Sequence, residues 1–457
     1  MTNALSDVSF WFDSMGELPP PDVPPLPQQL DVAIVGAGYT GLWSAYYLKQ
    51  RDPALRIGVF EAERVGFGAS GRNGGWCVGM AWGVEPLLTN PQTRSRGVGL
   101  ARALFDTVDE VGRVCQAENI DAHYAKGGTL TVATIPYQVP HLQRHVEHMH
   151  KIGFSENDYR WLPVDESRTR LAMTPNHGAV HFRHCAAVQP ARLVMGLADV
   201  VRRQGTTIYE ATPVTAIESG RVTTQRGVVK AGAVIRATEG YTDTIAGERR
   251  RIMPLYSMVT ATEPLPAEVW QQIGLKERET FGDSRRVVIY GQRTLDDRLV
   301  LGGRAGYYFA SKRRRSIPAN DPKVVRVKQL VTQLFPMLEG YRITHGWGGL
   351  MGVPRHWRPC VQWDTQTRTG WAGGYVGEGV AASNLAGRTV ADLVTGHKTA
   401  LTDLPWINDV SRRWEPEPFR YFGAKAIESF GDRADRDEFA TGAPSKFWGG
   451  LFRRFVG

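Results

Sequence analysis

The chain has 457 residues, of which 42% are hydrophobic and 22% are charged, and this length allows two domains of ordinary size. Such a composition is typical of a soluble globular enzyme and excludes a disordered or fibrous chain. The formal net charge of +9 leaves open an anionic substrate, an acidic partner, nucleic acid, or simply a basic soluble protein. No nucleic-acid-binding motif accompanies the basic residues, so nucleic acid is not an expected partner.

The four cysteines, Cys77, Cys115, Cys185 and Cys360, lie far apart and form no C-x-x-C pair. This spacing indicates reduced thiols and predicts a cytoplasmic protein. The N-terminal residues combine acids and aromatic side chains instead of a basic segment and an apolar core, so no signal peptide is predicted. No apolar stretch approaches the ~20 residues that span a bilayer, and a membrane partner is not expected.

Residues 1–29 form a proline-rich arm, and residues 18–27 are predicted to adopt an extended polyproline conformation. Ahead of the prolines, Ser9-Phe10-Trp11-Phe12 is too apolar to remain in solvent. We expect this short segment to pack on the body of the protein or on a partner subunit.

A dinucleotide-binding unit follows the arm. The strand Asp31–Val35 leads into Gly36-Ala37-Gly38-Tyr39-Thr40-Gly41, which fits G-x-G-x-x-G at the start of a predicted helix. A second strand, residues 55–60, ends at Glu61, where a carboxylate accepts ribose hydroxyls and repels a 2′-phosphate. The helix N-terminus is suited to hold the pyrophosphate charge, but the motif by itself does not separate NAD from FAD.

A second glycine-rich run, Gly66-Phe67-Gly68-Ala69-Ser70-Gly71-Arg72-Asn73-Gly74-Gly75, is too flexible for a regular element unless it wraps a ligand. With this run the sequence resembles the FAD-dependent D-amino-acid oxidase (DAO) superfamily, and within it the gamma-glutamylputrescine oxidase-like amine oxidoreductases. Similar segments recur at residues 213–230, 234–241, 299–304 and 347–380. The resemblance therefore covers roughly residues 30–400.

The resemblance implies an α/β fold, in which a Rossmann-like FAD-binding domain carries a second, antiparallel-sheet substrate domain of α+β type. Helices are predicted at residues 101–120, 138–152, 190–203, 321–334 and 379–393, and a strand at residues 123–134. We expect the following division: residues 1–29 as the arm, 30–95, 185–245 and 346–400 as the FAD-binding domain, 96–184 and 246–345 as the substrate domain, and 401–457 as a C-terminal extension.

The resemblance also implies which residues hold FAD, and the binding is expected to be non-covalent. They are Gly36, Gly38, Tyr39, Thr40, Gly41, Glu61, Ala62, Gly68, Ala69, Ser70, Arg72, Asn73, Gly74, Gly75, Val214, Ala237, Gly240, Gly349, Gly374, Gly377, Glu378, Gly379 and Val380. Two positions depart from the family pattern, because Glu239 stands where asparagine is usual and Glu378 where histidine is usual.

Four side chains are candidates for the substrate pocket. Tyr256 lies on a strand that in the family faces the substrate, and Trp347 precedes two glycines of the flavin segment, where it could form the wall of a cation cage. Arg355 could clamp a carboxylate bidentately, and Glu378 lies in the C-terminal flavin segment. Ordinary packing and a solvated loop are the competing interpretations. The basic runs at residues 249–251 and 312–315 are expected to be solvated turns.

The expected activity is oxidation of a C–N bond of a small-molecule amine or amino acid, with O2 or another electron acceptor. The excess of arginine favours a substrate with an anionic group. The alternatives are a flavin-bearing subunit of a heteromeric amine dehydrogenase and a flavin monooxygenase. No metal site is expected, since His141, His145 and His148 share only a helix face without a carboxylate ligand. The arm and the aromatic C-terminal tail are the candidate oligomer contacts.

Overall fold

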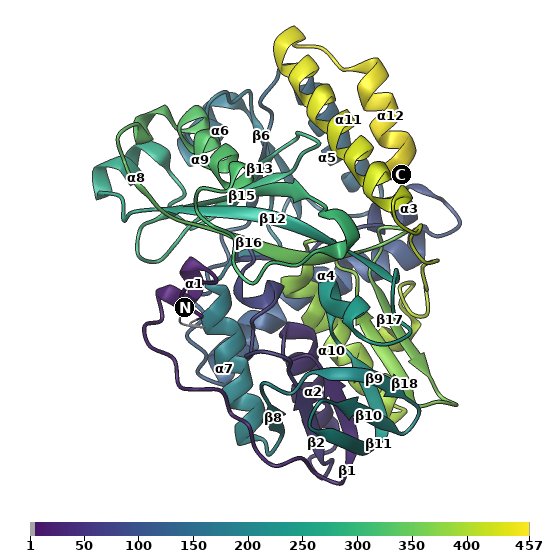
Figure 1. Cartoon of the computed structure of the whole chain (residues 1–457). Coiled ribbons are helices and arrows are strands. Elements are labelled where there is room, and N and C mark those ends of the chain that lie inside the picture. The colour runs from purple at the N-terminus through teal and green to yellow at the C-terminus, as the bar shows by residue number, and fades with distance from the viewer. Residues whose placement is uncertain (1–4, 457) are drawn as a thin grey trace.

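The computed structural model describes residues 5–456, apart from the side chains of residues 304, 305 and 456. It contains two eight-stranded sheets, one above the other in the view of Figure 1. The first sheet has the order β17-β18-β11-β1-β2-β8, and the hairpin β9–β10 joins it through β11. Its strands are β1 (Gln29–Val35), β2 (Ile57–Phe60), β8 (Thr207–Tyr209), β9 (Val214–Glu218), β10 (Arg221–Thr224), β11 (Gly227–Arg236), β17 (Cys360–Asp364) and β18 (Thr369–Gly373).

β1 is the centre of this sheet and pairs in parallel with β2 on one side and β11 on the other. Residues 32–35 are all apolar and buried, as a parallel strand covered on both faces requires. The carboxyl ends of these strands meet at one edge of the sheet. The predicted Rossmann-like unit is confirmed, and its glycine-rich turn lies at this edge.

Helices cover the faces of the first sheet, and two of them approach very closely. These helices are α2 (Tyr39–Arg51), α4 (Arg94–Ala117), α7 (Pro190–Arg203) and α10 (Gly379–Thr395). A Cβ added at Gly387 in α10 would lie 2.6 Å from the Cβ of Trp43 in α2 and 2.8 Å from the carbonyl carbon of Trp43. Gly387 therefore allows α2 and α10 to pack closely.

The second sheet has the order β16-β12-β15-β14-β13-β4-β6-β5, and its pairs are antiparallel except β4–β13. The helices α8 (Ala267–Ile273) and α9 (Pro322–Leu334) bury their apolar side chains against it. The strands are β4 (Thr129–Val132), β5 (Tyr159–Leu162), β6 (Ala179–Phe182), β12 (Ile252–Thr262), β13 (Thr280–Asp283), β14 (Ile289–Arg293), β15 (Leu299–Gly306) and β16 (Ile343–Pro354).

Several observed boundaries of strands and helices differ from the predicted ones. The predicted strand at residues 123–134 contracts to β4, which follows Gly128, whose φ of +82° interrupts the extended backbone. The predicted helix at residues 101–120 is α4, which begins at Arg94. The expected domain boundary at residue 346 falls inside β16, which pairs with β12 along its length.

The remaining elements connect the sheets and form the ends of the chain. Helix α11 is joined to the second sheet by ion pairs. Arg286, between β13 and β14, pairs with Glu438 of α11 at 2.5 Å and with Asp435 of α11 at 3.5 Å. No described helix combines the length and apolar character that a membrane crossing needs. These elements are α1 (Phe10–Asp13), β3 (Trp76–Val78), α3 (Val84–Thr89), α5 (Gln138–Lys151), α6 (Val164–Arg170), β7 (Cys185–Ala187), α11 (Phe419–Thr441) and α12 (Lys446–Val456), with 3-10 turns η1 (Ala69–Gly71), η2 (Glu239–Thr244), η3 (Phe309–Ser311), η4 (Pro336–Leu338) and η5 (Ala400–Asp403).

The α2–α10 contact gives a stability prediction. Gly387→Ala should lower the melting temperature, because the added methyl group overpacks the contact with Trp43 at a cost of about 1–3 kcal/mol. Gly423→Ala is the matched control, since no atom lies within 4 Å of the Cβ it would add in α11. The control should stabilise the protein by about 0.5–1 kcal/mol. Thermal unfolding of both variants measures the difference, and equal melting temperatures would contradict the close packing.

Candidate active site

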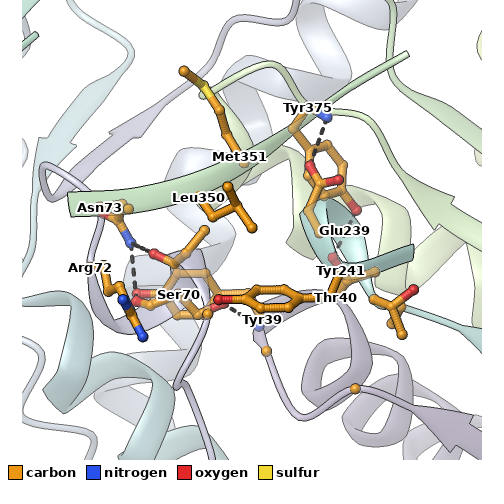
Figure 2. Close-up of a pocket in the computed structure, with 18 of the residues that line it drawn as sticks. Tyr39, Thr40, Ser70, Arg72, Asn73, Glu239, Tyr241, Leu350, Met351 and Tyr375 are labelled. Atoms are coloured by element: carbon orange, nitrogen blue, oxygen red, sulfur yellow. Dashed lines mark hydrogen bonds between the residues drawn. The ribbon is translucent and has the colours of Figure 1, made fainter. Parts of the chain in front are cut away.

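A cavity of about 670 Å³ lies between the two sheets, and residues from both line it. From the first sheet come the β1–α2 turn, the end of β2, β9 and the end of β11. From the second sheet come β12, β14 and β16, while the segments 67–76 and 375–383 complete the wall. Figure 2 shows side chains from these distant segments converging on one space.

The first end of the cavity is formed by the main chain of the glycine-rich turn. Gly36 has a φ of +107°, and a Cβ there would lie 2.5 Å from the carbonyl oxygen of Ala237 at the end of β11. A Cβ at Gly41 would lie 1.9 Å from the carbonyl oxygen of Gly36. Helix α2 begins at this turn, and its N-cap Gly38 makes no side-chain capping bond. The helix N-terminus is therefore positioned for an anion.

Glu61 lies beside this turn at the end of β2. Its carboxylate accepts hydrogen bonds from the Ala37 N–H at 2.8 Å and the Glu63 N–H at 3.0 Å. Burial raises the pKa of Glu61 to about 7. The carboxylate is thus fixed at the cavity wall, where it can accept a ribose hydroxyl.

Residues 67–70 and 72–74 of the second glycine-rich run line the cavity. The Asn73 amide donates to the carbonyl oxygens of Ala69 and Ser70 at 3.1 and 3.0 Å, and Ser70 Oγ accepts the Tyr39 N–H at 2.9 Å (Figure 2). Arg72 is almost completely buried, and burial lowers its pKa. Its Nε donates to the Phe67 carbonyl oxygen at 2.7 Å.

Glu239 ties the end of β11 to the C-terminal glycine segment. Its two carboxylate oxygens accept the N–H groups of Gly374 and Tyr375, each at 3.1 Å (Figure 2). Burial raises the pKa of Glu239 to about 7. Tyr375 in turn shares a hydrogen bond of 3.0 Å with Thr40 of α2. The departure from the family's asparagine therefore produces a structural carboxylate in the cavity wall.

The opposite end of the cavity is aromatic. Trp76 and Tyr290 meet edge to face with ring centroids 6.2 Å apart, and the Tyr290 hydroxyl lies 2.7 Å from Ser257 Oγ. Trp82 and the apolar side chains of Met80, Leu350 and Met351 line the same cavity. Glu378, the N-cap residue of α10, adds a carboxylate to the lining. Such a mixture of rings and a carboxylate suits an amine.

The basic run at residues 312–315 is not a solvated turn. Arg313, Arg314 and Arg315 line the cavity, and Arg313 and Arg315 pair with acids of segments distant in sequence. Arg313 contacts Asp243 in η2, and Arg315 NH1 lies 2.5 Å from Glu63 Oε2. The Arg315 carbonyl oxygen accepts from Arg72 NH1 at 2.8 Å. The expectation of a solvated turn was wrong, because ion pairs between distant segments are invisible in the local sequence.

The structure places the four substrate-pocket candidates in different surroundings, and only Glu378 lies among the described residues that line the cavity. Tyr256 faces the opposite side of β12, where its hydroxyl accepts the Arg314 N–H at 2.8 Å. Trp347 packs against Trp11 of the N-terminal arm. Arg355 pairs with Glu415 at 3.1 Å and stacks on Trp414, away from the cavity.

Most of the residues expected to contact FAD do line the cavity, and four glycines do not: Gly41, Gly75, Gly240 and Gly374. A Cβ added at any of these four glycines would lie within 3.1 Å of another protein atom. These glycines therefore allow close packing behind the residues that line the cavity. Ser257, Tyr290 and Met351 also line the cavity, and they were not predicted from the sequence. The alternation of β12 offered a signal for Ser257, since it had to face the side opposite Tyr256.

The donor set of the cavity fits FAD: a helix N-terminus and glycine turn for a pyrophosphate, Glu61 for a ribose, and an apolar chamber for a ring system. Among the described residues, no three His, Cys, Asp or Glu side chains are grouped as a metal site would require.

Comparison with known proteins agrees with this geometry. The family model described as DAO, FAD dependent oxidoreductase, matches residues 31–393. A gamma-glutamylputrescine oxidoreductase of Escherichia coli (strain K12) is 31% identical over 422 residues, which cover 88% of this chain and 93% of that protein. The chain therefore belongs to the DAO family and is a FAD-dependent oxidoreductase.

Solved structures show the same fold. The crystal structure of glycine oxidase from Geobacillus kaustophilus superposes with a TM-score of 0.70 at 22% identity, covering 85% of this chain and all of that one. An L-proline dehydrogenase from P. horikoshii gives a TM-score of 0.67 at 19% identity, covering 83% of this chain and 96% of that one. The predicted fold class is confirmed.

Glu239 gives a pH prediction. A carboxyl whose pKa is raised on folding binds more protons in the folded state, so its stabilisation is complete below pH 4.5 and is lost as the pH rises through about 7. Glu239→Gln removes this titration. Between pH 4.5 and about 7, the melting temperature of the wild type should therefore fall ~1–3 °C further than that of the variant. Parallel pH profiles would show that Glu239 is not a buried titrating group.

Proposed function

We propose that this protein oxidises the C–N bond of a small-molecule amine or amino acid. The observation that carries the proposal is one cavity whose lining combines a glycine-rich turn suited to a dinucleotide with aromatic rings and the Glu378 carboxylate. The relatives support it, because they include a gamma-glutamylputrescine oxidoreductase and a glycine oxidase. The net charge of +9 favours a substrate that also carries an anionic group.

In this proposal the first sheet and its helices form the FAD-binding domain, and the second sheet forms the substrate domain. The turn at Gly36–Thr40 holds the pyrophosphate, Glu61 holds the adenosine ribose, and the main chain of residues 68–74 and 377–380 encloses the rest of the cofactor. When bound, FAD supplies a two-electron acceptor for the hydride of the carbon next to nitrogen.

The residues of the aromatic end position the amine. The Glu378 carboxylate attracts the ammonium group, and the rings of Trp76, Trp82 and Tyr290 provide faces for a cation and exclude water. The hydroxyl oxygens of Ser257 and Tyr290 lie 2.7 Å apart, and both groups can form hydrogen bonds with a polar substituent of the substrate. The chain thus orients the substrate. Hydride transfer needs the neutral amine, so the ammonium group gives up one proton after binding, and the Glu378 carboxylate is the acceptor that the lining offers.

We also propose that FAD is held non-covalently. No cysteine or histidine is among the described residues that line the cavity. Cys77, the cysteine nearest in sequence to the flavin loop, is buried, and burial raises its pKa well above the ordinary value, which keeps it a thiol. All four cysteines are free and buried, which supports a reducing, cytoplasmic location.

A second candidate function is the flavin-bearing subunit of a heteromeric amine dehydrogenase. The helices α11 and α12 expose several large rings, with Phe419 at 70%, Phe422 at 65% and Phe447 at 65% exposure. Exposed rings of this kind are favourable in protein interfaces. Copurification with another chain would favour this candidate over a self-sufficient enzyme.

The direct test is anaerobic mixing of the purified holoenzyme with primary amines, N-methyl amines and amino acids. We expect at least one class to bleach the visible flavin band, because hydride transfer removes the oxidised chromophore. Amines that also carry a carboxylate should bleach it fastest. Bound flavin that no member of the panel reduces would refute amine oxidation, and acid precipitation that leaves colour in the pellet would refute non-covalent binding.

Glu378→Gln should raise the amine concentration needed for half-maximal flavin reduction about 10-fold or more, because a charge-assisted hydrogen bond to the ammonium is lost. Stopped-flow flavin reduction measures this change. Glu415→Gln is the matched control, since that carboxylate pairs with Arg355 outside the cavity. An unchanged concentration dependence in Glu378→Gln would remove Glu378 from the substrate site.

A further inference from the structure

Three successive carbonyl groups of the glycine-rich loop 66–75 accept hydrogen bonds from side chains behind the cavity. Two of the three donors belong to the N-terminal arm. The pairs are Ser9 Oγ to the Gly71 oxygen at 2.7 Å, Trp347 Nε1 to the Arg72 oxygen at 2.9 Å, and Trp11 Nε1 to the Asn73 oxygen at 2.7 Å. The loop is therefore fixed from the side opposite to the space it lines.

Apolar packing reinforces these bonds. Phe12 of α1 has no exposed surface, and a Cβ at Gly71 would lie 2.3 Å from its ring. Trp11 is 1% exposed and meets the ring of Trp347 edge to face, with centroids 5.9 Å apart. Because the loop and α1 fit without space for a methyl group, movement of one displaces the other.

The arm is itself attached to both halves of the molecule. Gln189, the N-cap residue of α7, donates through Nε2 to the Trp11 carbonyl oxygen at 2.7 Å and to Ser14 Oγ at 3.1 Å. His345 of β16 lies 3.1 Å from the Asp13 carboxylate. In Figure 1, α1 accordingly lies beside α7 and next to β16. The matched family residues begin at residue 31, so this support lies outside them.

We propose that α1 is a positioning element for FAD, which fixes the main chain of residues 68–74 in the conformation that encloses the cofactor. The inference rests on the proposed function, in which this loop contacts FAD. A free glycine-rich loop samples many conformations, and ordering it would consume part of the binding free energy. Three carbonyl anchors remove that cost before FAD binds.

The test uses the full chain with FAD removed and then titrated back, followed by quenching of flavin fluorescence. Trp11→Phe keeps an aromatic ring but removes the N–H that donates to Asn73, and Ser9→Ala removes the hydroxyl that donates to Gly71. Each variant should weaken FAD binding about 5- to 30-fold, since each leaves a buried carbonyl without its donor. The visible bands of the bound flavin should shift with them.

Matched controls separate positioning from general destabilisation. Trp406→Phe removes the ring N–H of a buried tryptophan that has no hydrogen-bond partner within the described chain, so FAD affinity should stay within about twofold of wild type. Circular dichroism establishes that each variant is folded, and if Trp11→Phe does not fold, Ser9→Ala decides.

The possible failures are distinguishable. A wild-type chain that binds no FAD would refute the proposed function and say nothing against the packing of α1. A wild type that binds FAD, together with Trp11→Phe and Ser9→Ala variants of equal affinity, would overturn the role of α1. Equal weakening in Trp406→Phe would also overturn it, because the effect would then be a general loss of stability.

Discussion

The close approach of main chain to main chain at Gly36 is the constraint on which the cavity depends. A side chain at this residue would collide with the Ala237 carbonyl group, and one at Gly41 would collide with Gly36 itself. These two glycines bring the start of α2, the end of β1 and the end of β11 together at one edge of the sheet. A helix N-terminus and a carboxylate, Glu61, are thereby presented to the same space.

The walls of this space are held by contacts between segments that are distant in sequence. Glu239 fixes the C-terminal glycine segment through two N–H groups, and Arg315 crosses from the second sheet's loop to Glu63. The N-terminal arm holds the glycine-rich loop from behind. Each of these contacts joins parts of the chain that cannot order one another locally, so the cavity exists only in the complete fold.

Charge is distributed unevenly along the cavity. Glu61 and Glu239 are acids whose burial raises their pKa to about 7, while Arg72 is a buried cation whose pKa is lowered. Burial is the main cause of all three shifts. Glu378, Trp76 and Trp82 also line the cavity, so its wall includes a carboxylate and aromatic rings.

The sequence by itself determined the cofactor class, because the glycine turn, its helix and Glu61 are neighbours along the chain and their geometry is local. It also determined helices such as α7 and α10, whose apolar or small residues recur at helical spacing. Only the tertiary structure decided that Ser257 and not Tyr256 lines the cavity, that Arg355 pairs with Glu415, and that the arginines 313–315 face inward. Which face of a strand is buried, and which acid meets an arginine, depends on partners tens to hundreds of residues away.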